Sequence, residues 1–223
     1  MVALHRLLAA TVIFCVLCLV VSIEFSSVAA ARAEALPRAS DVHVDLFRGL
    51  ANIFSRGLDT LADRLNRQGY TARVFPHRSW RTVAQRITAE RARGQRHVIV
   101  LIGHSLGANA ILQLAQELQR SQVPIALVVT YDATNPRQVP NNVQHVVNFF
   151  QHNGIGRPVT AMPGFKGRLE NIDLTTDRSL THWNIEESSR LHDQIIARIM
   201  QIVNQDMAGK VQPAGHGNRS RGR

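Results

Sequence analysis

The chain has 223 residues, 45% of them hydrophobic, and a formal net charge of +10 at pH 7. That length supports one domain of ordinary size with a single core. Both cysteines, Cys15 and Cys18, lie in an N-terminal apolar run, so the rest of the chain excludes a disulfide scaffold and a cysteine-bound metal.

The first 33 residues have the pattern of a secretory signal peptide. Basic side chains precede an apolar run, Leu7–Ile23, and Ala31-Arg32-Ala33 fits the small-x-small sequence that signal peptidase cleaves. The alternative is an N-terminal membrane anchor that stays attached. In either case we expect the folded domain, residues 34–208, to lie outside the cytoplasm, secreted or in the periplasm.

Short β-rich runs then alternate with helical patterns. The expected strands are Val42–Phe47, Thr71–Phe75, His97–Ile102, Ile125–Thr130, Val143–Phe150 and Leu169–Leu174. The expected helices cover about 54–65, 80–87 with Ser79 as its cap, 106–118 and 185–204. This alternation predicts a single three-layer α/β/α domain with a mostly parallel central sheet and no second domain.

The pentapeptide Gly103-His104-Ser105-Leu106-Gly107 stands between a continuous apolar strand and a helix. A serine hydroxyl is a weak nucleophile, and a sharp strand-to-helix turn exposes its oxygen to a base and to a substrate carbonyl. The two glycines permit that turn because they carry no side chain where strand and helix approach each other. The context favours an activated Ser105 over a glycine-rich turn with an incidental serine.

This pentapeptide resembles the nucleophile elbow of lipases, esterases and thioesterases in the α/β-hydrolase superfamily, over about residues 41–204. The resemblance implies a compact α/β-hydrolase fold and a triad in the chain order serine, acid, histidine. Asp132 is the expected acid, since it directly follows a buried strand at the carboxyl edge of the sheet. Asp173 and Asp177 are the alternatives.

The resemblance places the base between the last strand and the closing helix, where His182 stands. His152 is the main alternative, and it becomes the better choice if 169–174 is not a strand. His104 belongs to the elbow and is expected only to pack.

Two backbone N–H groups are the expected oxyanion donors. Leu106 follows the nucleophile, and Leu50 lies in the loop after the first strand, where lipases and esterases often have a glycine-rich segment. The sequence departs from the His-Gly-Gly pattern of many esterases at that loop. The second donor is therefore less well defined than the first.

These residues predict hydrolysis of a carboxylic ester or thioester in two steps through an acyl-enzyme, with no cofactor or metal. The substrate is expected to be a small-molecule or lipid-like acyl compound. The segment between Asp132 and His182 is too short for a large cap domain. The alternatives are a non-catalytic protein of the same fold that binds an anionic partner, and an acyltransferase that uses the same triad.

The tail, residues 209–223, is rich in glycine and arginine without apolar periodicity, and is expected to be disordered. No aromatic residues interleave its arginines, so we expect no specific nucleic-acid partner. The basic charge makes an anionic membrane surface a candidate partner.

Overall fold

The computed structural model describes the backbone of residues 38–50 and 56–211, and the side chains of these residues up to residue 204. In chain order its elements are η1 (Ala39–Asp41), β1 (Val42–Arg48), α2 (Gly57–Arg67), β2 (Thr71–Pro76), η2 (His77–Ser79), α3 (Trp80–Ala92), β3 (Val98–His104), α4 (Leu106–Arg120), β4 (Leu127–Tyr131), β5 (His145–Phe150), β6 (Arg168–Asp173), η3 (Ile185–Glu187) and α5 (Ser189–Val211). The expected alternation of strands and helices is confirmed.

The six strands form one parallel sheet in the order β2-β1-β3-β4-β5-β6. After β1 the chain forms β2 at one edge of the sheet. It then crosses over β1 to form β3 on the other side of β1, and β4, β5 and β6 follow outward from β3. The carboxyl ends of β1 and β3 therefore flank a topological switch point, where ligands bind in open α/β sheets.

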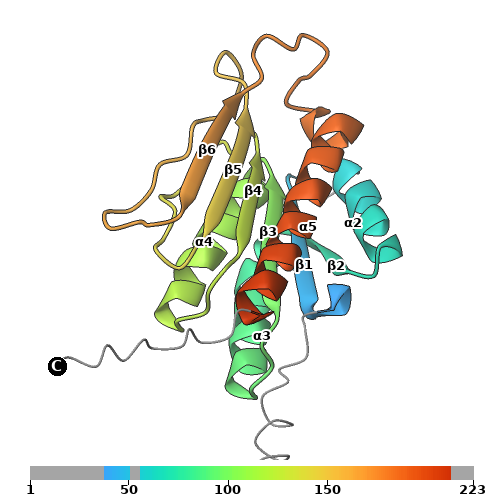
Figure 1. Ribbon diagram of the computed structural model, residues 1–223. Coiled ribbons are helices and arrows are strands. Elements are labelled where there is room, and N and C mark those ends of the chain that lie inside the picture. Colours follow the sequence, from blue (N-terminus) through green and yellow to red (C-terminus); the bar gives the residue numbers. More distant parts are fainter. Residues whose placement is uncertain (1–37, 51–55, 212–223) are drawn as a thin grey trace, which may run out of the picture. The chain divides into compact units, whose positions relative to one another are not determined.

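Helices cover both faces of the sheet, as the sequence predicts. Alternate strand residues pack on either side: Val44 and Leu46 of β1 belong to the core under α2 and α5, whereas Phe47 belongs to the core under α3 and α4. Figure 1 shows α5 crossing in front of the sheet and α4 lying behind it. The structure is thus the three-layer α/β/α fold.

Three local details differ from the sequence pattern. Ile125 makes only an isolated bridge with Val143, and β4 begins at Leu127. Ser79 occupies the N-cap position of α3 but makes no capping hydrogen bond, because the preceding 3₁₀ turn leaves it at φ −80°, ψ 3° instead of extended. A 3₁₀ turn, η3, precedes α5, which extends through Val211.

The signal segment at residues 1–33 and residues 212–223 of the expected tail lie outside the described residues. Residues 209–211, expected to be disordered with that tail, belong to α5. Within 38–50 and 56–211, no helix is both long enough and apolar enough to cross a membrane.

Candidate active site

Ser105 occupies the turn between β3 and α4, with φ 55° and ψ −120°. A positive φ at a residue with a side chain costs roughly 1–3 kcal/mol, so the surrounding structure must enforce it. A Cβ at Gly103 would lie 2.5 Å from the carbonyl oxygen of Gly107, and a Cβ at Gly107 would lie 1.9 Å from that of Phe47. Both glycines are therefore required by the close approach of α4 to β1 and β3.

Asp132 directly follows β4, is fully buried, and has a positive φ of 46°. Its Oδ1 accepts a hydrogen bond from the backbone N–H of Gln151 at 3.1 Å. Gly156 packs against the same carboxylate, since a Cβ there would lie 2.1 Å from Oδ1. The carboxylate is held from two directions at the carboxyl edge of the sheet.

His182 lies in the loop between β6 and η3, and its side chain is 9% exposed. Its Nε2 is 3.1 Å from Ser105 Oγ, and its Nδ1 is 3.1 Å from Asp132 Oδ2. Because a carboxylate only accepts, Nδ1–H donates to Asp132 and Nε2 accepts from the serine hydroxyl. The structure thus brings the three expected side chains together in an order that can move a proton from serine to histidine.

The alternative acids and bases lie elsewhere. His152 has a side chain that is 69% exposed and faces Asp173, with Nδ1 3.6 Å from Oδ2. Asp173 accepts hydrogen bonds from Thr175, and Asp177 pairs with Arg190 at 2.6 Å. Since 168–173 is a strand, the condition that would have favoured His152 does not hold.

Two buried polar side chains hold the loop that carries His182. His104 donates from Nε2 to the carbonyl oxygen of His182 at 2.8 Å, and the amide of Gln151 donates to the carbonyl oxygen of Leu180 at 2.9 Å. The sequence predicted packing alone for His104 and no role for Gln151. A signal was present for both, because a polar residue at the end of a buried strand needs a partner, and each lies at or just after such an end.

Burial, with the neighbouring His182, lowers the pKa of His104 to about 4. The ring is therefore neutral at physiological pH, and its proton sits on Nε2, where the carbonyl accepts it. Glu186, also buried, has its pKa raised by desolvation to about 7. Below that pH Glu186 is mostly neutral.

The expected oxyanion donors flank Ser105. Leu106 is the first residue of α4, where backbone N–H groups have no acceptor within the helix. The loop after β1 runs alongside the serine, since a Cβ at Gly49 would lie 3.1 Å from Ser105 Cβ. His77 Nδ1 donates to the Gly49 carbonyl at 3.1 Å and holds this loop. The donor roles of Leu106 and Leu50 stay predictions.

Three exposed apolar side chains belong to residues next to these positions in the chain. Leu50, Ile155 and Trp183 are three of the four large hydrophobic side chains that are exposed in the described part of the chain. Leu50 follows Gly49 beside the serine, Ile155 precedes Gly156 beside Asp132, and the Trp183 ring lies 5.2 Å from that of His182. We call these three residues the apolar rim.

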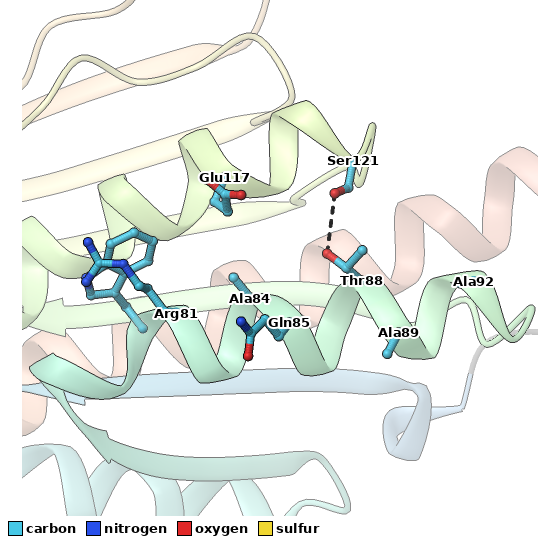
Figure 2. A pocket seen from close by; sticks show the side chains of 9 residues that line it. Arg81, Ala84, Gln85, Thr88, Ala89, Ala92, Glu117 and Ser121 are labelled. Atoms are coloured by element: carbon cyan, nitrogen blue, oxygen red, sulfur yellow. Dashed lines mark hydrogen bonds between the residues drawn. The ribbon is translucent and has the colours of Figure 1, made fainter.

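A groove of about 440 Å³ lies between α3 and α4, and none of the expected site residues lines it (Figure 2). The Arg81 guanidinium carbon lies 4.4 Å from the Trp80 ring centroid at one end, and Thr88 donates to Ser121 across 3.5 Å at the other.

The chain also matches a known protein family. The family described as the thioesterase domain matches residues 36–148, which include Ser105 and Asp132 and end before His182. The chain belongs to the thioesterase domain family. A search of curated proteins found none that matches this chain.

Solved structures resemble this thioesterase-family chain in fold. Human thioesterase 2 is 11% identical with a TM-score of 0.50, over 74% of this chain and 97% of that one. The RedJ thioesterase from the prodiginine biosynthetic pathway of Streptomyces coelicolor is 13% identical with a TM-score of 0.46, over 74% and 90% of the two chains. An acetylxylan esterase is 12% identical with a TM-score of 0.48, over 74% and 99%. At such identities the likeness concerns the fold alone.

Proposed function

We propose that the protein is a serine hydrolase that cleaves a carboxylic ester or thioester through an acyl-enzyme, with Ser105 as nucleophile, His182 as base and Asp132 as acid. The observation that carries this proposal is the pair of 3.1 Å contacts that link Ser105 Oγ to His182 Nε2 and His182 Nδ1 to Asp132 Oδ2. Membership of the thioesterase domain family supports the reaction class.

In the first step Ser105 Oγ attacks the acyl carbon while its proton passes to His182 Nε2. The imidazolium returns that proton to the leaving alkoxide or thiolate as the bond to the acyl carbon breaks. In the second step water attacks the acyl-enzyme, gives its proton to His182, and releases the acid as Ser105 recovers its own. The N–H groups of Leu106 and Leu50 are proposed to stabilise the oxyanion in both steps.

Asp132 is proposed to fix the tautomer and orientation of His182 and to stabilise the imidazolium that forms. Its complete burial strengthens this interaction because few water molecules screen it. The hydrogen bond from Gln151 and the contact with Gly156 leave the carboxylate little freedom to turn away.

The apolar rim supports an acyl substrate with a hydrophobic portion. Burying an exposed leucine or tryptophan surface against a chain is favourable by roughly 25 cal/mol per Å². Exposed side chains such as Leu50 and Trp183, both 59% exposed, offer that surface next to the serine and the histidine.

We also propose that the protein acts outside the cytoplasm, as the N-terminal sequence favours. The net charge of +10 supports attraction to anionic membrane surfaces, where lipid-like acyl substrates are found.

The proposal is tested with Ser105→Ala on short and long p-nitrophenyl esters and an acyl thioester. We expect loss of activity and of labelling by a fluorophosphonate, whereas Ser121→Ala, at the α3–α4 groove, keeps both. Unchanged turnover in Ser105→Ala would overturn the proposal. If the wild type transfers the acyl group to an added alcohol in preference to water, the protein is an acyltransferase; if the wild type neither turns over nor labels, the non-catalytic alternative holds.

A further inference from the structure

Three metal-ligand side chains meet at the edge of the sheet opposite Ser105. His43 is near the start of β1, His97 immediately precedes β3, and Glu90 is in the last turn of α3. Each offers a ligand atom, and these atoms all lie within 4.8 Å of one another. Because β1 and β3 are parallel, this group is at their amino ends, away from the site at their carboxyl ends.

His43 is a buried histidine with an unsatisfied nitrogen. Only 9% of the residue is exposed, and its Nδ1 has no hydrogen-bond partner among the described residues. A buried polar atom without a partner costs about 1–3 kcal/mol and calls for an explanation. Burial and the neighbouring His97 lower the pKa of His43 to about 4, so its lone pair is available at neutral pH.

We propose that His43, Glu90 and His97 form a site for a divalent transition-metal ion, with zinc as the preferred occupant. Two imidazoles and one carboxylate are a ligand set that zinc accepts, with water in the fourth position. The ion would join β1, α3 and the start of β3 and give the unpaired His43 nitrogen a partner. Oxygen-seeking ions such as Mg²⁺ are disfavoured by the two imidazoles.

Coordination requires a small local change. Ligand atoms around a tetrahedral zinc at 2.0–2.1 Å are about 3.4 Å apart, closer than the present limit of 4.8 Å. The rings of His43 and His97 are stacked, with centroids 3.7 Å apart at 15°, so one ring must turn to direct its lone pair at the ion. His97 can do so because it is partly exposed and lines a cavity of about 360 Å³.

Glu90 now pairs with Arg86 at 3.0 Å, and metal binding would compete with that contact. Arg86 also pairs with the buried Asp45 at 2.7 Å, so its charge stays balanced when Glu90 turns to the ion.

The test is titration of the full chain, without a histidine tag, with Zn²⁺ by calorimetry and with Co²⁺ by visible absorption. We expect one zinc ion per chain and a cobalt spectrum typical of four-coordinate nitrogen and oxygen ligands. His97→Ala and Glu90→Gln should each weaken zinc binding by about 100-fold or more, since each removes a direct ligand and loss of an outer-shell contact alone costs 10–100-fold.

His152→Ala is the matched control, because His152 is also a histidine beside a carboxylate, Asp173. The His152→Ala variant should bind zinc as the wild type does. Ser105→Ala should also bind zinc normally, so the zinc proposal can fail or hold independently of the proposed hydrolase activity. Circular dichroism without metal shows whether each variant is folded.

A wild-type chain that binds no zinc would overturn the proposal. So would zinc binding that survives in folded His97→Ala and Glu90→Gln, since the ion would then lie elsewhere in the chain.

Discussion

His104 donates a hydrogen bond from Nε2 to the carbonyl oxygen of His182 across 2.8 Å. The residue before the proposed nucleophile therefore holds the backbone of the proposed base. Removing this contact in His104→Ala should lower kcat by about tenfold or more, since a buried hydrogen bond is worth about 1 kcal/mol and its loss leaves the carbonyl unsatisfied. KM should change little because His104 is buried and only 1% exposed.

His104→Gln is the informative companion, because its amide nitrogen can replace the imidazole Nε2–H as a donor. We expect Gln to recover most of the lost kcat in an assay on a p-nitrophenyl ester. Equal loss in both variants, or a rise in KM alone, would contradict a positioning role for His104.

The titration of His104 also affects stability. Its pKa is about 4 in the folded protein against about 6.5 unfolded. Between these values the unfolded chain binds the extra proton, so stability falls as pH decreases from 6.5 to 4. The full effect is on the order of 3 kcal/mol. Urea unfolding at pH 7 and pH 4.5 measures the free energy of unfolding, which should fall less for His104→Gln than for the wild type. An identical fall in both proteins would refute the lowered pKa of His104.

Asp132→Asn should reduce kcat by about 10³–10⁴-fold, because an amide no longer selects the tautomer with Nδ1–H and no longer balances the imidazolium. Steady-state kinetics on the same ester measures this. Asp173→Asn is the control, since Asp173 contacts Thr175 and His152 instead of His182. Comparable losses in the two variants would remove Asp132 from its proposed role.

Gly156→Ala should impair activity through Asp132. The new methyl group would lie 2.1 Å from Oδ1, so the carboxylate must move away from His182. We expect kcat to fall by about tenfold or more, in line with the sensitivity of catalysis to small displacements. Gly154→Ala, whose Cβ would meet nothing closer than 3.4 Å, should retain activity; equal kcat values for the two variants would argue against this role for Gly156.

Substitutions in the apolar rim should alter substrate preference. Ile155→Ser and Trp183→Ser should each raise KM for long-chain esters by about five- to thirtyfold, equivalent to 1–2 kcal/mol of lost apolar contact. Short-chain esters should be affected less. Met200→Ser removes the remaining large hydrophobic side chain that is exposed among the described residues, on α5, and should leave both KM values unchanged. A chain-length profile identical to wild type would show that the rim does not contact the acyl group.

The sequence predicted the central strands β3 and β4 well because they are buried on both faces and read as continuous apolar runs. The pentapeptide at 103–107 marks one strand end directly, and the acid follows from the end of the next strand. His182 depended on chain order and resemblance, since a lone histidine in a loop carries no periodic signal. Its place beside Ser105 became visible only with the fold.

Contacts between distant segments were beyond the sequence pattern. His104 and His182 are 78 positions apart, and nothing local indicates that one holds the other. Gly156 resembles any loop glycine until the carboxylate of Asp132 is seen against it. The grouping of His43, Glu90 and His97 likewise depends on how α3 packs beside β1 and β3.

Ser105 and Asp132 both have backbone conformations that residues with side chains rarely adopt. Glycine at 105 would relieve that strain while deleting the proposed nucleophile, whereas glycine at 132 would also leave the Gln151 N–H without its acceptor. A population of variants selected only for folding should therefore accumulate glycine at 105, and only selection for turnover should keep the serine.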